Sequence, residues 1–311
     1  MYKRQAIRAL GIGAGDEVIT TPFSFVASAN CILYEGARPV FVDIEPDTLG
    51  LDVDLVEAAA TPRTAGVLPV HVFGRPSRIG PLEELSMRHG WHLVEDACEA
   101  LGCAVDGRPL GSFGEASVLA FYPNKQITTG EGGVVLVDDA SLAEELRSLR
   151  NQGRDEDGTW LRHVRLGYNY RMDELSAAVG VAQLERREAM AADRRRVACA
   201  YETALGGREW LRLPRAAANE SVDWFVYVVQ LDGSIDRTRV MRELDRAGVA
   251  SRPYFSPLHL QPFYRRELGY GPGDFPVTER IAATTLALPW SPNLSEEDIA
   301  YVAAALVDAV E

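Results

Sequence analysis

Residues 117–137 read SVLAFYPNKQITTGEGGVVLV, and this stretch decides how the rest of the chain is interpreted. An apolar, β-branched run at 117–122 predicts a buried strand, and a second run at 134–137 predicts another. The glycine-rich segment before the second run predicts a turn rather than a phosphate loop, because no Gly-Lys-Ser or Gly-Lys-Thr follows it. Lys125 is therefore expected on a loop between two buried strands.

Lysine is almost absent from the chain. Lys3 and Lys125 are its two lysines, and the other strongly basic side chains are arginines. In such a composition a lysine is expected where arginine cannot do the chemistry, and a Schiff base is such a case. It needs a primary amine that can lose its proton. An isolated lysine is more often a solvated surface charge, but the flanking strands favour a functional lysine here.

Strand-like and helix-like runs alternate in the N-terminal part of the chain. Strands are predicted at 17–20, 39–43, 66–72 and 92–96, with helices at 25–35, 53–59 and 81–89. This alternation indicates an α/β fold with a largely parallel sheet and helices on both faces. Ligands gather at the carboxyl ends of such strands, where Asp96 and Lys125 both fall.

A long predicted helix, 174–205, leads away from this sheet. The elements predicted beyond it are a strand at 224–231, a helix at 237–247, a strand at 249–252 and a helix at 295–310. This order indicates a smaller α+β domain. We therefore expect a large domain over 1–190 and a small C-terminal domain over 191–311.

Composition narrows the class of function. The formal net charge of −13 argues against a nucleic-acid partner, because phosphate backbones are bound through basic patches. The four cysteines show no metal-ligand or redox spacing, so no metal site is predicted. An apolar stretch of membrane-spanning length and a signal peptide are both lacking in the sequence, so we expect no membrane partner and a cytoplasmic location.

Asp96 ends a predicted strand upstream of Lys125. A lysine Schiff base to pyridoxal phosphate works through an electron sink, which is strongest when a carboxylate keeps the pyridine nitrogen protonated. An aspartate at a strand end is, by itself, more often a helix cap. The Lys125 segment makes the cofactor partner the favoured interpretation of Asp96.

Several segments at compatible spacing resemble the DegT/StrS-type aminotransferases of fold type I, which act on nucleotide-linked keto-sugars. They include TPFSFVASANCI, PVFVDI, LPVHVFG, VEDACEALG, FYPNKQITTGEGG, LGYNYRMDELSAAVGVAQLER and SRPYFSPLH. The resemblance runs from about Ala6 to the C-terminus. It implies pyridoxal 5′-phosphate as the cofactor and a mostly parallel, seven-stranded-type sheet, followed by a small C-terminal α+β domain.

The resemblance implies roles for residues around the cofactor. Lys125 matches the Schiff-base lysine, and Asp96 matches the partner of the pyridine nitrogen. Phe25 is similar to the aromatic residue that stacks on the ring, with Ser24 beside it. Glu99 lies where many relatives carry a polar group near the phenolic oxygen, and glutamate there is similar to perosamine synthase-like members.

A second subunit and a sugar pocket are implied as well. Asn169 matches an asparagine that reaches the cofactor phosphate from the neighbouring subunit, so a homodimer with a shared active site is expected. His259 and Arg252, in SRPYFSPLH, are similar to positions that line the sugar-nucleotide pocket. His71 is as consistent with a structural histidine as with a cofactor neighbour.

The implied activity is transamination. An amino acid, expected to be glutamate, gives its amino group to a nucleotide-linked keto-deoxysugar, expected to be a 4-keto-6-deoxyhexose, for polysaccharide, O-antigen or natural-product sugar biosynthesis. One alternative is a pyridoxal phosphate-dependent sugar dehydratase of the same family, but those members carry histidine at the position of Lys125. Another is a non-catalytic sensory or regulatory relative, which the Asp96 and Lys125 pair argues against.

The N-terminus is expected to be altered. Residues 1–5, MYKRQ, match a translated sequencing adapter and are expected to be an artefact, with the N-terminal part of the large domain missing. The family's Ser-Gly-Thr turn, whose amides hold the cofactor phosphate, would lie in that missing part. Ala120 also replaces a serine that many relatives use for the same phosphate. Cofactor binding by this chain is therefore expected to be weak.

Overall fold

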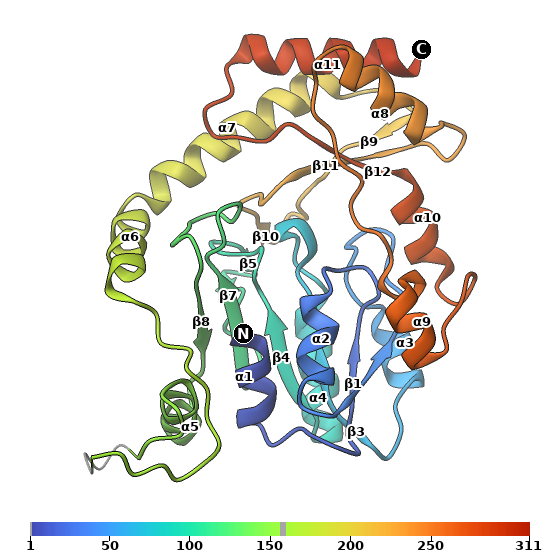
Figure 1. Ribbon diagram of the computed structural model, residues 1–311. Coiled ribbons are helices and arrows are strands. Elements are labelled where there is room, and N and C mark those ends of the chain that lie inside the picture. Colours follow the sequence, from blue (N-terminus) through green and yellow to red (C-terminus); the bar gives the residue numbers. More distant parts are fainter. Residues whose placement is uncertain (1, 156–159) are drawn as a thin grey trace.

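The computed structural model describes residues 2–155 and 160–311, so Met1 of the suspected 1–5 segment lies outside the described residues. A six-stranded sheet with the order β2-β1-β3-β4-β7-β8 forms its centre (Figure 1). The strands are β1 (Glu17–Thr20), β2 (Arg38–Phe41), β3 (Thr64–Leu68), β4 (His92–Asp96), β7 (Ala116–Ala120) and β8 (Gly133–Leu136). The predicted α/β class is confirmed.

The sheet is mostly parallel, as predicted. Strands β2, β1, β3, β4 and β7 run parallel to one another, and β8 is antiparallel to β7. Within the described residues the sheet has six strands, one fewer than the expected seven-stranded type. Strand β8 pairs only with β7 and forms one edge of the sheet. Strand β1 is buried along its whole length, as a sheet covered on both faces requires.

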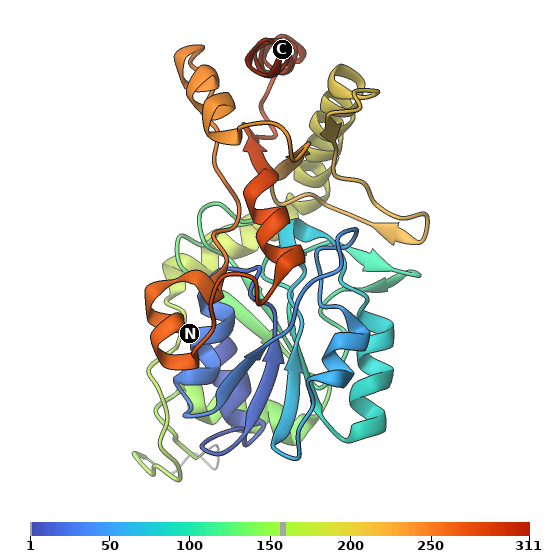
Figure 2. The same cartoon turned by 90° about the vertical axis from the view of Figure 1, so that its right-hand side faces the viewer.

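Helices cover both faces of the sheet (Figures 1 and 2). On one face, α1 (Tyr2–Ala9) packs beside α2 (Ala27–Leu33) and α5 (Ala140–Arg150). On the other, α3 (Val53–Ala58) packs against α4 (Ile79–His89). The side chains of Asp52 and Asp139 cap α3 and α5 by accepting hydrogen bonds from backbone amides. Helix α4 ends at Gly90, whose φ of 70° is in the left-handed region.

A second, smaller sheet lies in the C-terminal part of the chain. It is antiparallel and consists of β9 (Leu211–Arg212), β11 (Tyr227–Leu231) and β12 (Thr285–Leu288) in the order β12-β11-β9. Helix α11 (Glu296–Val310) packs against both α7 (Arg187–Leu205) and α8 (Arg237–Arg246). The domain boundary expected between residues 190 and 191 falls inside helix α7, which is continuous there.

The remaining elements are short or connect these two parts. They are η1 (Val72–Gly74), β5 (Ala104–Val105), β6 (Arg108–Pro109), α6 (Glu174–Glu185), β10 (Glu220–Ser221), η2 (Leu258–Leu260), α9 (Pro262–Leu268) and α10 (Pro276–Thr284).

Two sequence predictions are wrong in detail. The helix predicted over 174–205 is two helices, because the backbone leaves helical geometry at Arg186, with φ −97° and ψ 0°. The strand predicted at 249–252 is reduced to a single bridge between Arg252 and Ala287. The Val249 amide instead bonds to the Leu244 carbonyl oxygen at 2.8 Å, which closes the end of α8.

The thiols differ in their environments. Cys31, Cys98 and Cys103 are buried and Cys199 is exposed. Burial raises the pKa of each buried thiol to about 12. In the described part of the chain, no helix is both long and apolar enough to cross a membrane.

Candidate active site

Asp96 is the last residue of β4, and its carboxylate is buried. Oδ2 accepts a hydrogen bond of 2.6 Å from the Ser28 hydroxyl on α2, and Oδ1 accepts one of 3.3 Å from the Cys98 amide. The ammonium of Lys3, on α1, lies 2.9 Å from Oδ2 and forms an ion pair with it. The carboxylate is therefore a buried anion with a cation already beside it.

The pair of Asp96 and Lys3 is stabilised in its charged form. Burial by itself raises the pKa of Asp96, but Lys3 and the Ser28 hydroxyl outweigh it and lower the pKa to about 2. Burial acts to lower the pKa of Lys3, yet the attraction of Asp96 more than offsets this, so the pKa is raised. Sequence analysis missed Lys3 as a site residue, because nothing near it in the sequence shows that α1 meets the end of β4.

Lys125 lies on the loop between β7 and β8. Its ammonium is 3.2 Å from Oε1 of Glu99 and 4.0 Å from the centre of the Phe225 ring, a cation–π contact. Its backbone amide donates a 2.9 Å hydrogen bond to the Tyr122 carbonyl oxygen. The side chain is only 14% exposed. The one lysine of this loop therefore faces a carboxylate and an aromatic ring.

Gln126 fixes this arrangement from the next position along the chain. Its Nε2 donates to the carbonyl oxygens of Glu99 and Asp223, at 2.5 and 3.1 Å. Arg194, on α7, donates to the Gln126 carbonyl oxygen at 2.7 Å. Sequence analysis missed Gln126 and Phe225, because their partners come from distant parts of the chain. Adjacency to Lys125 was the only signal for Gln126.

Glu99 is held from a second side. Its Oε2 accepts a 2.8 Å hydrogen bond from the Phe73 amide in η1, so both carboxylate oxygens have a partner. Phe73 adopts a left-handed φ of 62°, which shapes the turn that presents this amide. The carboxylate that contacts Lys125 therefore has a fixed position.

Ser24 and Phe25 precede α2 near the same group of side chains. The Ser24 hydroxyl lies 3.0 Å from that of Ser28, which itself donates to Asp96. The Phe25 side chain is 63% exposed. An exposed aromatic face is available to stack on a flat ligand, whereas Ser24 is buried and supports the carboxylate indirectly.

Arg252 is exposed, and its guanidinium donates a 2.9 Å hydrogen bond to the Ser251 carbonyl oxygen. Burial and Glu99 raise the pKa of Tyr254, whereas Arg252 lowers it. The Tyr254 ring also packs edge-on against that of Phe73, with ring centres 5.9 Å apart, and the Phe73 amide donates to Glu99. This places Arg252 in the same part of the molecule as Glu99.

His259 lies in a buried environment. Its side chain is fully buried, with Nε2 3.0 Å from Oε1 of Glu279 and its ring edge-on to Phe275. His259 is therefore shielded from solvent in this structure, and its place in the sugar-nucleotide pocket stays a prediction. The cause of the shielding is local, because η2 packs the ring into the apolar cluster around Phe275.

Asn169 is separate from the other predicted site residues of this chain. It is exposed in the segment between α5 and α6 and forms a backbone bridge with Asn151. Its side chain makes no hydrogen bond to Asp96, Glu99 or Lys125 in the described structure. A single copy of the chain does not bring Asn169 into contact with them.

His71 belongs to a buried structural network. Its Nε2 lies 2.9 Å from Oε2 of Glu95, and its Nδ1 accepts a 3.1 Å hydrogen bond from the Ser77 amide. An acceptor at Nδ1 leaves the proton of the neutral ring on Nε2, which then donates to Glu95. Of the two interpretations left open by the sequence, the structure favours a structural histidine.

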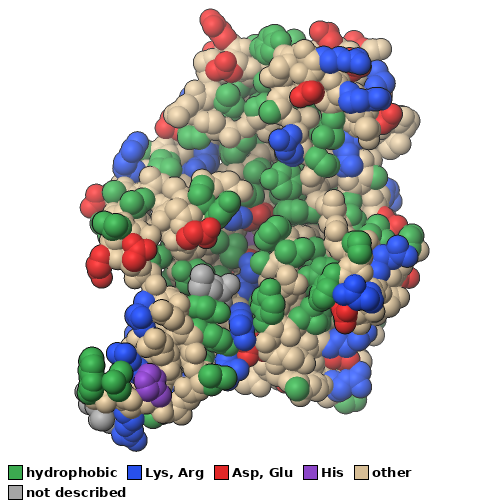
Figure 3. Space-filling model, in the orientation of Figure 1, with side chains coloured by type: hydrophobic (Ala, Val, Ile, Leu, Met, Phe, Trp, Pro, Cys, Tyr) green, Lys and Arg blue, Asp and Glu red, His purple; other side chains and the backbone are tan. Residues whose placement is uncertain are grey.

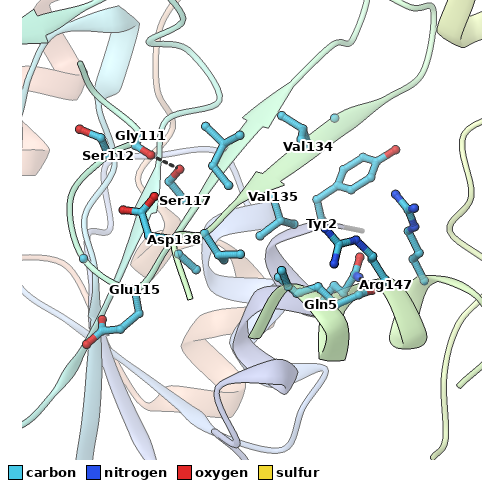
Figure 4. Close-up of a pocket in the computed structure, with 18 of the residues that line it drawn as sticks. Tyr2, Gln5, Gly111, Ser112, Glu115, Ser117, Val134, Val135, Asp138 and Arg147 are labelled. Atoms are coloured by element: carbon cyan, nitrogen blue, oxygen red, sulfur yellow. Dashed lines mark hydrogen bonds between the residues drawn. The ribbon is translucent and has the colours of Figure 1, made fainter. Parts of the chain in front are cut away.

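A cavity of about 570 Å³ lies elsewhere, between α1, α5 and the edge strand β8 (Figure 4). Tyr2 and Gln5 line it on one side together with Arg147, while Val134 and Val135 of β8 form another wall. The predicted site residues are not part of its lining. This cavity therefore lies apart from Lys125 and Asp96.

Comparison with known proteins connects this geometry to a family. A family profile matches residues 4–307, nearly the whole chain. The chain belongs to the DegT/DnrJ/EryC1/StrS aminotransferase family.

Three members illustrate how closely this DegT-family chain resembles its relatives. GDP-perosamine synthase of Caulobacter vibrioides is 40% identical over 306 residues, which cover 97% of this chain and 81% of that protein. The UDP-N-acetyl-3-dehydro-alpha-D-glucosamine 3-aminotransferase of Acidithiobacillus ferrooxidans is 38% identical, with coverage of 96% and 79%. The structure of S. venezuelae DesV with a ketimine intermediate has a TM-score of 0.93 at 36% identity, with coverage of 99% and 82%.

These likenesses confirm the family, the aminotransferase activity and pyridoxal phosphate as the cofactor of this DegT-family enzyme. The side chains present fit the cofactor. Asp96 is a buried carboxylate kept in its charged form, and a buried anion is the partner that a protonated pyridine nitrogen needs once Lys3 is displaced. Lys125 carries a primary amine of the kind that can form an imine with the cofactor's aldehyde.

Proposed function

We propose that this DegT-family aminotransferase transfers an amino group from glutamate to a nucleotide-linked 4-keto-6-deoxyhexose. The observation that carries the proposal is the 3.2 Å contact between the Lys125 ammonium and Glu99. A glutamate at this position is similar to perosamine synthase-like members, and a GDP-perosamine synthase is 40% identical to this chain. The product would be an amino sugar for polysaccharide, O-antigen or natural-product biosynthesis.

Each central side chain has one task in this proposal. Pyridoxal phosphate, when bound, supplies an aldehyde that takes up an amino group and a ring that withdraws electrons from the adjacent carbon. Asp96 keeps the ring nitrogen protonated. Lys125 would move a proton between the α-carbon of the donor amino acid and the cofactor's C4′ carbon. Glu99 accepts a hydrogen bond from Lys125 and orients its amine.

The surrounding residues bind and position. Phe25 offers its exposed face to the cofactor ring, and Ser24 supports Ser28 and, through it, Asp96. Arg252 is assigned to the sugar nucleotide, because it is exposed near Glu99 and carries a positive charge that suits a diphosphate. His259 is buried in this structure, and its contact with the sugar nucleotide stays a prediction.

We also propose that a second copy of the chain completes the site. Large apolar side chains are exposed on α6 and on the segment before it, including Leu175 at 82%, Trp160 at 81% and Leu166 at 74% (Figure 3). Large apolar side chains exposed along one stretch of the chain favour an interface there. Asn169 lies in the same stretch, so a dimer formed here would let it reach the partner's cofactor phosphate.

The test is a substrate panel. The chain, supplied with pyridoxal phosphate, is incubated with glutamate and each of several nucleotide-linked keto-sugars, and amino sugar and 2-oxoglutarate are quantified. We expect equal amounts of both products with a 4-keto-6-deoxyhexose. A 3-keto sugar belongs in the panel, because the 3-aminotransferase of A. ferrooxidans is 38% identical.

Other outcomes separate the alternatives. Turnover with the 3-keto sugar alone would reject the 4-keto assignment and retain transamination. Loss of a sugar hydroxyl without formation of an amino sugar would identify a dehydratase. Cofactor binding with no turnover on any sugar would favour a sensory or regulatory relative.

A further inference from the structure

Arg75 is a partly buried cation. It follows η1, and its Nε is sealed from solvent with no hydrogen-bond partner among residues 2–155 and 160–311. Those residues offer its guanidinium no ion pair either. Burial lowers the pKa of Arg75. An uncompensated buried charge is costly, and such groups in native proteins commonly mark a bound ion or water.

Arg75 lines a cavity of about 380 Å³ between η1 and the segment that follows α7. Arg208, Arg212 and Arg215 line the same cavity, against a single acidic side chain, Glu209. The cavity thus concentrates positive charge in a chain whose formal net charge is −13. This composition suits an anion.

Two of these arginines are fixed by contacts with the protein. Arg208 Nη1 donates a 3.0 Å hydrogen bond to the Ala204 carbonyl oxygen, at the end of α7. Arg212, on β9, forms an ion pair with Asp47. Their positions are therefore set before any ligand arrives, which lowers the entropic cost of binding.

The carboxylates near Arg75 are engaged elsewhere. Asp47 pairs with Arg212, and Glu220 accepts a 2.8 Å hydrogen bond from the Ala217 amide. Both carboxylates act to raise the pKa of Arg75, but burial outweighs them. The charge of Arg75 therefore remains uncompensated within the described structure.

We propose that this cavity is an oxyanion site that takes a phosphate or diphosphate group, with Arg75 as its buried anchor. Guanidinium groups bind such groups through paired, charge-assisted hydrogen bonds. The group can belong to a nucleotide or be inorganic. This inference does not depend on the roles proposed for Lys125 and Asp96. The site adjoins the turn that positions Glu99, because Phe73 donates to Glu99 two residues before Arg75.

The experiment titrates the protein with inorganic phosphate, pyrophosphate and a nucleoside diphosphate at constant ionic strength, by calorimetry and by unfolding temperature. Arg75→Met removes the anchoring charge. Arg88→Met is the matched control, because Arg88 is an exposed arginine of α4 that pairs with Glu57. We expect Arg75→Met to weaken pyrophosphate binding by roughly tenfold to a hundredfold and Arg88→Met to leave it unchanged.

A second measurement uses the uncompensated charge itself. In phosphate-free buffer Arg75→Met should unfold at a higher temperature than the unmodified protein, because it lacks the buried charge. Added pyrophosphate should raise the unfolding temperature of the unmodified protein more than that of the variant, so the difference between the two temperatures should become smaller. If this variant fails to fold, Arg75→Lys should still weaken binding, because it loses the planar fork.

Comparison of the three probes identifies the kind of anion that the cavity binds. Tighter binding of the nucleoside diphosphate than of pyrophosphate would point to a nucleotide, and equal binding to a free oxyanion. Lack of saturable binding by all three probes would overturn the proposal. So would an Arg75→Met variant that binds pyrophosphate as tightly as the unmodified protein.

Discussion

At the scale of single residues, Lys125 owes its chemistry to being an amine. Lys125→Arg keeps the charge that faces Glu99 but cannot easily lose a proton, so transamination should be abolished while the fold is retained. Formation of 2-oxoglutarate and the thermal unfolding curve measure these two effects. Turnover that survives in this variant would remove Lys125 from the mechanism.

The other lysine provides a matched control. Lys3→Arg replaces the second amine while keeping a cation for Asp96. Each variant is treated with borohydride in the presence of pyridoxal phosphate. The Lys3→Arg variant should become labelled with the cofactor at Lys125, and the Lys125→Arg variant should remain unlabelled. Labelling at Lys3 in the unmodified chain would show that the two amines compete for the aldehyde.

Lys3 occupies the partner position that Asp96 would offer to the cofactor ring. Lys3→Met should therefore bind pyridoxal phosphate more tightly, by about tenfold, because no side-chain cation has to be displaced from Asp96. Equilibrium dialysis measures the affinity. Arg8→Met, a change on the same helix that affects a pair with Glu35, should leave it unaltered.

The same substitution should lower the stability of the cofactor-free protein. Because the pKa of Asp96 is lowered to about 2, its charged form contributes stability above its ordinary pKa and loses it as the pH falls through about 2. Urea unfolding at pH 7 should show Lys3→Met less stable by about 2 kcal/mol, with the difference fading toward pH 2. An equal loss at both pH values would mean that packing, not charge, is responsible.

The sequence was informative about this site where one residue type carries the chemistry. Lys125 and Asp96 could be chosen because an amine and a carboxylate stand at or just beyond strand ends, whereas Glu99 was chosen from the family resemblance. Gln126 could not be chosen, since its role depends on the Glu99 and Asp223 carbonyl oxygens meeting it in space. Contacts between distant backbone groups leave no trace in local sequence.

At the scale of elements, α6 presents its apolar side chains to solvent. Leu175→Asp should shift the protein from dimer to monomer, because a carboxylate buried in an apolar interface without a partner is costly. Sedimentation velocity measures the distribution. Met87→Asp is the control, since Met87 is 69% exposed on a different helix. A dimer that tolerates Leu175→Asp would place the interface on another surface.

Helices and strands could be predicted from the sequence where a short apolar run ends in turn residues. The prediction failed where a helical pattern of apolar residues continues across a point at which the helix ends. Strands β1, β4 and β7 belong to the first kind. The α6–α7 boundary belongs to the second, because Glu185 and Arg186 suit a helix as well as a corner. His259 shows a related limit, since a polar ring in a loop gave no sign of the apolar cluster that encloses it.

At the scale of the whole molecule, the parallel sheet gathers residues from α2, β4 and the β7–β8 loop at one edge, and Phe225 joins them from the C-terminal part. The alternation of strands and helices predicted the first three. The contribution of Phe225 could not be predicted, because it depends on how the smaller sheet is set against the larger one.

Because three of the four thiols are buried, the rate at which they react with a thiol reagent measures how often the protein unfolds globally or locally. Because thiolates are the reactive species, Cys31, Cys98 and Cys103 should be inert in the native chain, and one equivalent of thiol reagent should react, at Cys199. In denaturant four equivalents should react. Mass spectrometry of the labelled peptides checks this count, and early labelling at another site would contradict it.

Cys98 adds spatial resolution to this measurement, because its sulfur lies 3.3 Å from the Lys3 ammonium and its amide donates to Asp96. Its labelling rate should report how often this corner of the protein opens, and a ligand that engages Asp96 should slow the modification of Cys98 more than that of Cys103. Pulsed alkylation of Cys98 would thus measure local opening of the site without an activity assay.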